Sequence, residues 1–202
     1  MHQQAALGLQ ILYYGIIFER YFTMNELEKF IELVKVKAAE KSADILPNAG
    51  ADHASVAMSA LFENTRHSAN LLLGSLDGNV SDQPNYIESL KNFLSRDGIE
   101  LNILFIHDPN PRSKTYLLLQ EYKREGKNIR FKQLNEAAGA ILLNRLDNKG
   151  NEFHYSVFDK TMFRYEKDIH NYLAWFSFND SSTSIMLDDL FQEAFEKAGE
   201  IT

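Results

Sequence analysis

The stretch EFHYSVFDKTMFRYEKD, residues 152–168, decides the fold, because residues that favour β-strands alternate there with polar and charged ones. On a strand, neighbouring side chains point to opposite faces of the sheet. Phe153, Tyr155 and Val157 therefore share one face, and His154 and Ser156 share the other. The stretch is predicted to form a β-hairpin with one apolar face and one polar face.

The turn of this hairpin is expected at residues 159–161, after which charged residues again alternate with aromatic ones. The two polar rows can share one face only if the loop has an odd number of residues. Pairing Phe158 with Met162 meets this condition. The polar residues then face one another as two pairs, His154 with Glu166 and Ser156 with Arg164. A shift of one residue would move the charges to the apolar face, so this register is predicted.

Composition narrows the classes of function. Of the 202 residues, 45% are hydrophobic and 24% are charged, which is typical of a globular protein rather than a disordered one. The chain has no cysteine, which excludes disulfides, thiolate metal ligands and cysteine nucleophiles, and which agrees with a cytoplasmic location. The net charge of −7 disfavours general nucleic-acid binding, so any phosphate binding would depend on a local patch.

Helical patterns alternate with short apolar runs upstream of the hairpin. Four runs are predicted to be strands: NLLLGSL (70–76), IELNILFIH (99–107), NIRFKQL (128–134) and residues 141–146. Helix-length segments between successive strands imply βαβ units with parallel strands. We therefore expect an α/β fold with a mixed, largely parallel sheet flanked by helices, and a terminal helix over residues 181–199.

The first part of the chain is expected to be a separate helical extension. Residues 43–52 contain Pro47 and Gly50 and are typical of a linker, which predicts an extension over 1–46 and an α/β domain over 47–202. The apolar run within residues 1–22 is too short to span a membrane, and a buried or partner-facing helix is its simplest interpretation. Contact with a membrane surface is the weaker alternative. Met24 is an alternative start of translation, because the composition shifts there.

The order of elements over about residues 53–198 resembles the phospholipase D superfamily, more by pattern than by identity. The resemblance rests on the three upstream runs, the strand that carries His154, and the segment FND (178–180) before the terminal helix. It implies an α/β sandwich. In active members of that superfamily, the histidine of an H-x-K-x4-D motif attacks a phosphodiester, the lysine binds phosphate, and two motif copies form one site.

This sequence departs from that motif. His154 occupies the histidine position, but Ser156 stands at the lysine position and Thr161 at the aspartate position. Only one copy is present, so an active site would need a homodimer. The first interpretation is a catalytically degenerate phospholipase D-like domain that acts as a binding or regulatory module, for instance in a bacterial phage-defence or regulatory complex. The alternative is a homodimeric phosphodiesterase or nuclease in which His154 is the nucleophile and Arg164 binds phosphate. A third interpretation places the function in residues 1–22, as a hydrophobic helix that binds a partner or touches a membrane.

The candidate catalytic residues are those of the polar hairpin face and its turn: His154, Ser156, Arg164, Glu166 and Asp159. Each also has a structural interpretation. Glu166 can simply hold His154 across the hairpin, and Arg164 with Glu166 can be a structural ion pair. Asp159 can close the turn.

Asn179, Asp180 and His107 are candidate ligand-binding residues. The first two can instead cap the terminal helix. His107 follows a predicted strand at the edge where open α/β sheets commonly bind ligands, although loop charges are often merely solvated. We found no metal-ligand spacing and no glycine-rich phosphate loop, so neither a metal nor a cofactor is expected. A homodimer or another protein partner is expected, and a phosphate-containing ligand is possible.

Overall fold

The computed structural model describes residues 25–146 and 152–201. The chain divides into two compact units after Leu33, within helix α2 (Glu26–Ala39). Reciprocal hydrogen bonds of 2.9 Å between Asn25 and Glu28 cap the start of α2. The predictions for residues 1–22 lie outside the described residues, and the boundary between residues 46 and 47 stays a prediction. Among the helices described, none has both the length and the apolar character needed to cross a bilayer.

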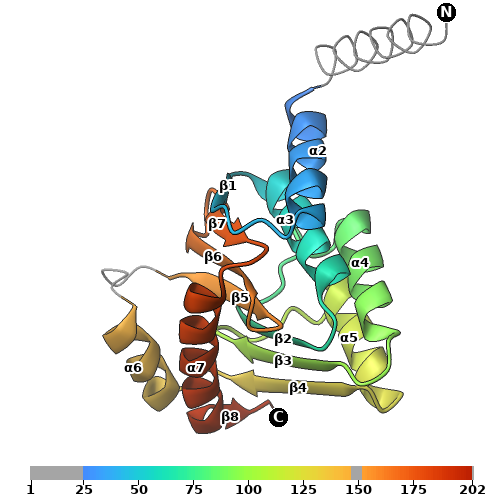
Figure 1. Ribbon diagram of the computed structural model, residues 1–202. Coiled ribbons are helices and arrows are strands. Elements are labelled where there is room, and N and C mark those ends of the chain that lie inside the picture. Colours follow the sequence, from blue (N-terminus) through green and yellow to red (C-terminus); the bar gives the residue numbers. More distant parts are fainter. Residues whose placement is uncertain (1–24, 147–151, 202) are drawn as a thin grey trace, which may run out of the picture. The chain divides into compact units, whose positions relative to one another are not determined.

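The second unit is built on one sheet of eight strands, in the order β1-β7-β6-β5-β2-β3-β4-β8 (Figure 1). The strands are β1 (Leu46–Asn48), β2 (Ser68–Leu73), β3 (Glu100–Phe105), β4 (Asn128–Gln133), β5 (His154–Phe158), β6 (Met162–Asp168), β7 (Leu173–Ser177) and β8 (Gly199–Glu200).

The expectation of a largely parallel sheet is wrong. In the described part of the chain, only β2 with β3 and β3 with β4 pair in parallel, and these are the strands joined by helices. The remaining neighbours are antiparallel, because β5, β6 and β7 follow one another through short turns and β5 returns alongside β2. The α/β class and the flanking helices are confirmed.

The predicted register of the hairpin is confirmed. His154 pairs with Glu166, Ser156 with Arg164, and Phe158 with Met162. The turn places Asp159 at φ 50° and Lys160 at φ 54°, the left-handed conformation that two consecutive turn residues adopt in a tight hairpin.

Helices cover both faces of the sheet, which makes the second unit a three-layer sandwich (Figure 1). One face carries α3 (Ala51–Asn64), α4 (Pro84–Leu94) and α5 (Lys114–Arg124), and the other carries α6 (Glu136–Arg145) and α7 (Ser181–Lys197). The apolar hairpin residues Phe153, Tyr155 and Val157 pack with Leu190 and Phe191 of α7. The polar hairpin face therefore lies on the side of α3 and α4.

Two segments differ from their predicted structure. Residues 141–146, predicted to be a strand, belong mostly to α6, whose N-cap Asn135 accepts a 2.9 Å hydrogen bond from the Ala138 amide. A short apolar run does not distinguish a strand from a helix by its periodicity. The predicted linker contains β1, which pairs with β7 at the edge of the sheet, where Pro47 is tolerated.

Candidate functional site

The polar hairpin face borders a cavity of about 420 Å³. Its walls come from the hairpin, from the loop that follows β2, and from α3 and α4, which contribute Met58 and Tyr86. His107, after β3, lies at the rim. Because β2 and β3 are parallel, their carboxyl ends meet at this edge of the sheet, which is where open α/β sheets commonly hold ligands.

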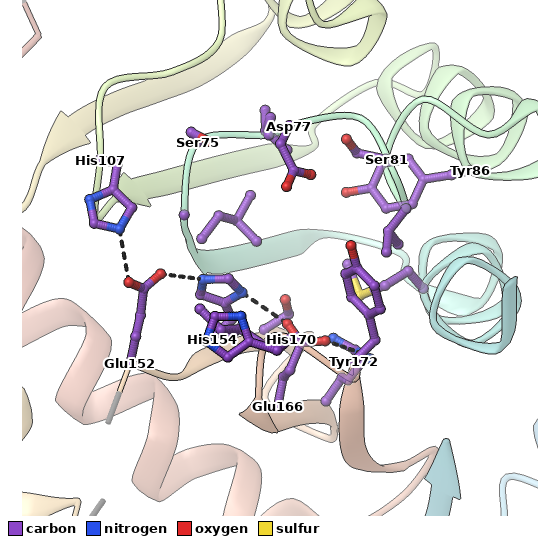
Figure 2. A pocket seen from close by; sticks show the side chains of 18 residues that line it. Ser75, Asp77, Ser81, Tyr86, His107, Glu152, His154, Glu166, His170 and Tyr172 are labelled. Atoms are coloured by element: carbon purple, nitrogen blue, oxygen red, sulfur yellow. Dashed lines mark hydrogen bonds and ion pairs between the residues drawn. The ribbon is translucent and has the colours of Figure 1, made fainter. Parts of the chain in front are cut away.

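Two carboxylates hold the imidazole of His154. Its Nδ1 lies 2.9 Å from Oε2 of Glu166, and its Nε2 lies 3.1 Å from Oε1 of Glu152 (Figure 2). The second oxygen of Glu152 lies 2.8 Å from Nε2 of His107. Both ring nitrogens of His154 are thus engaged by acceptors.

Glu166 also binds Arg164, with 2.7 Å between Oε1 and Nη2, and both side chains are more than nine-tenths buried. Nε of Arg164 donates to Oδ1 of Asn48 on β1, at 3.1 Å. The amide nitrogen of Asn48 in turn donates to the backbone carbonyl of Tyr172, at 2.8 Å. A continuous network therefore joins the first strand, the hairpin and the turn before β7.

The two carboxylates that hold His154 are ionised at neutral pH. Burial raises the pKa of Glu166, but hydrogen bonding from His154 and the charge of Arg164 outweigh burial and leave its pKa below the usual value. The pKa of Glu152 is lowered in the same way, since bonds from His107 and His154 outweigh burial. An ionised carboxylate can only accept a hydrogen bond, so both ring nitrogens of His154 face acceptor oxygens.

The opposite wall of the cavity carries Asp77, Ser81 and Tyr86, across from His154 and Glu166 (Figure 2). The side chain of Tyr86 is almost fully buried, and burial raises the pKa of its phenol above the usual value.

The structure brings His154, Ser156, Arg164, Glu166 and His107 together around this cavity, and separates the other predicted site residues from it. Asp159 instead accepts hydrogen bonds from three backbone amides at the start of β2, those of Arg66, His67 and Ser68.

Asp180 is the N-cap of α7 and accepts bonds from the amide and hydroxyl of Thr183, at 3.0 and 2.7 Å. The backbone amide of Asn179 donates to Ser177. Asp180 therefore caps α7, as the capping interpretation expects, whereas the bond of Asn179 is to the last residue of β7.

Glu152, Asp77 and Tyr86 were not identified from the sequence. The position of Glu152 could have been predicted, because side chains two residues apart in an extended chain point to the same side, as those of residues 152, 154 and 156 do. Asp77 and Tyr86 reach the cavity only through the packing of the β2 loop and α4. No group of three or more potential metal ligands gathers anywhere in the described ranges.

Comparisons with known proteins bear on the fold. No protein-family model matches the sequence, and no curated protein matches it. Among solved structures, TrmBL2, an archaeal chromatin protein, is 15% identical with a TM-score of 0.53, over 100% of this chain and 72% of that one.

Two further structures match over 78% of this chain. NucT from Helicobacter pylori is 13% identical with a TM-score of 0.51, and the match covers 100% of that chain. Nuc, a phospholipase D family member from Salmonella typhimurium, is 10% identical with a TM-score of 0.52 over 99% of its chain. Identities this low establish the fold alone. The chain accordingly has a phospholipase D-like α/β fold.

Proposed function

We propose that this phospholipase D-like domain binds a small ligand in the cavity beside His154, as a binding or regulatory module, and does not cleave phosphodiesters. The observation that carries the proposal is the bonding of His154. A histidine nucleophile attacks through a ring nitrogen that can reach the phosphorus atom, and both ring nitrogens of His154 already lie within hydrogen-bond distance of carboxylate oxygens. Neither nitrogen is without a partner inside the protein.

The phosphate-binding cation of the motif is also missing from its usual position. Ser156 stands there, and the nearest cation, Arg164, already bonds Glu166 and Asn48. Catalysis of phosphoryl transfer requires positive charge directed at the phosphate oxygens. Arg164 is a poor substitute for that reason, because its charge is neutralised within the protein.

The cavity itself supports a binding role. A volume of about 420 Å³ lies in the range of small-molecule sites, and the walls combine apolar side chains with a few polar groups. The regulatory part of the proposal draws on TrmBL2, a structure reported for its mode of DNA binding. With a net charge of −7, this chain is better suited to sensing a ligand for such an assembly than to contacting DNA itself. A phage-defence or regulatory complex is the proposed context.

An activity assay tests the absence of catalysis. Purified protein is incubated with bis(p-nitrophenyl) phosphate and with single- and double-stranded DNA, next to His154→Ala, while light scattering records its mass in solution. We expect no turnover above buffer, and the same result for the variant. Turnover that disappears in His154→Ala, from a dimer, would establish the homodimeric phosphodiesterase instead.

Ligand binding needs its own assay. Native mass spectrometry after incubation with a bacterial metabolite extract should reveal a small-molecule adduct. Gly74→Leu, which fills the cavity beside His154, should remove the adduct, while Gly139→Ala on α6 should keep it. An adduct that persists in a folded Gly74→Leu protein would place binding elsewhere.

A further inference from the structure

The charges around the cavity are not balanced. Its lining holds three carboxylates, those of Asp77, Glu152 and Glu166, together with the guanidinium of Arg164 and the imidazoles of His107, His154 and His170. Glu166 pairs with Arg164 and His154, and Glu152 pairs with His154 and His107. Asp77 makes no ion pair with any residue that the structure describes, and its carboxylate is directed toward the cavity (Figure 2). Among the carboxylates and the guanidinium of the lining, the uncommitted charge is therefore negative.

An anionic ligand would meet this site at a disadvantage. Arg164 and His154 each lie within 3.1 Å of a carboxylate oxygen already, so a phosphate or carboxylate ligand would have to compete with a partner inside the protein. It would also approach Asp77, which carries the same sign. A positively charged ligand would meet neither obstacle.

The other residues that line the cavity indicate the uncharged part of the ligand. Met58, Leu76, Val80 and Ile169 give the cavity a largely apolar wall. Beside them, the phenol of Tyr86 belongs to a residue that is only 3% exposed, and its hydroxyl makes no hydrogen bond to any residue within 25–146 and 152–201. This hydroxyl can therefore bond a polar group of a ligand.

We propose that the cavity takes a small organic cation, an apolar body that carries a protonated amine, with Asp77 as its counter-ion. The inference rests on the proposed binding function and names its ligand class. The apolar body lies against Met58 and Val80, and the ammonium group points to the Asp77 side of the cavity, where the aromatic ring of Tyr172 also lines the wall. Tyr86 supplies a hydrogen bond to a polar substituent.

Matched ligands test the proposal on the full chain. Affinities are measured by ligand-observed NMR for phenethylamine, 2-phenylethanol and phenylacetate, for hexylamine, hexanol and hexanoate, and for phenyl phosphate. We expect at least one amine to bind about tenfold more tightly than its alcohol and carboxylate analogues. Asp77→Asn should abolish that preference and leave the affinity of the alcohol unchanged. Asp108→Asn, an exposed carboxylate after β3 outside the lining, changes the net charge equally and should keep it.

The other outcomes separate this inference from the function on which it rests. Equal affinity of amine and alcohol, or tighter binding of an anion, would overturn the organic-cation proposal while a binding cavity remained. Failure of every ligand, including the metabolite extract, would overturn both. An amine preference that survives in Asp77→Asn would refute the role of Asp77 as counter-ion.

Discussion

Gly74 lies against His154, so closely that a Cβ atom on this glycine would be 3.2 Å from Nε2 of the imidazole. The neighbouring carboxylates restrict any movement of that ring away from the intruding atom. The missing side chain at position 74 thus preserves both the cavity and the bond to Glu152.

Gly74→Ala should displace His154 and lengthen its bond to Glu152. The weaker contact changes the hydrogen bonding of Nε2 but leaves that of Nδ1 in place. The ¹⁵N NMR shifts of the two histidine ring nitrogens measure this directly. Gly139→Ala is the matched control, because its Cβ would meet nothing closer than 3.9 Å. Unchanged ring nitrogen shifts of His154 in Gly74→Ala would contradict the close contact.

Glu166→Gln should lower the free energy of unfolding by about 3 kcal/mol, because it leaves the charge of Arg164 buried without its partner. Urea unfolding measures the loss. Glu193→Gln is the control, since the Arg145–Glu193 pair spans 3.6 Å and its side chains are 69% and 50% exposed. That change should cost less than about 0.5 kcal/mol. Similar losses for the two variants would argue against a stabilising buried pair.

Acid should destabilise the fold through the same carboxylate. The folded pKa of Glu166 lies below its usual value of 4.5, so its stabilising contribution is complete above that pH. The contribution is lost as the pH falls through the lowered pKa, because the unfolded chain takes up the proton first. Urea unfolding between pH 7 and pH 3 should therefore show a steeper decline for the parent protein than for Glu166→Gln. Parallel declines would show that Glu166 has the same pKa in both states.

Asp159→Ala should destabilise the protein more than Asp159→Asn. The carboxylate accepts bonds from three backbone amides, and the residue has a φ of 50°, which asparagine tolerates better than alanine. We expect a loss of about 2 kcal/mol for alanine and roughly half of that for asparagine. Thermal unfolding at constant pH compares the two. Equal losses would mean that asparagine replaces neither the carboxylate's bonds nor its backbone conformation better than alanine does.

The hairpin could be predicted from the sequence because its alternation and its odd loop leave one register that keeps charges out of the core. The same alternation is sufficient to place His154, Ser156, Arg164 and Glu166 on one face of the hairpin, as the strand pairing confirms. Strand direction could not be predicted as well. Helix-length connections imply parallel neighbours, but they do not reveal that β5 returns beside β2 in the opposite direction.

The rest of the site depends on tertiary packing. Asn48 lies in a three-residue edge strand that contains a proline, and no periodicity reveals so short an element. Its bond to Arg164 joins residues 116 positions apart in the chain. Tyr86 has the pattern of a buried helix residue, and only the placement of α4 turns its hydroxyl toward a cavity.

The two bonds of Asn48 have a consequence for communication along the chain. This side chain accepts a hydrogen bond from Arg164 and donates one to the carbonyl of Tyr172, and both of these residues line the cavity. Asn48 itself belongs to β1, the strand that follows α2. Any rearrangement of the chain before β1 that shifts Asn48 must also alter the energy of an occupied cavity. Reciprocity then requires that occupancy alter the stability of β1 by the same amount. The amide of one asparagine is therefore a thermodynamic link between the cavity and the edge strand β1.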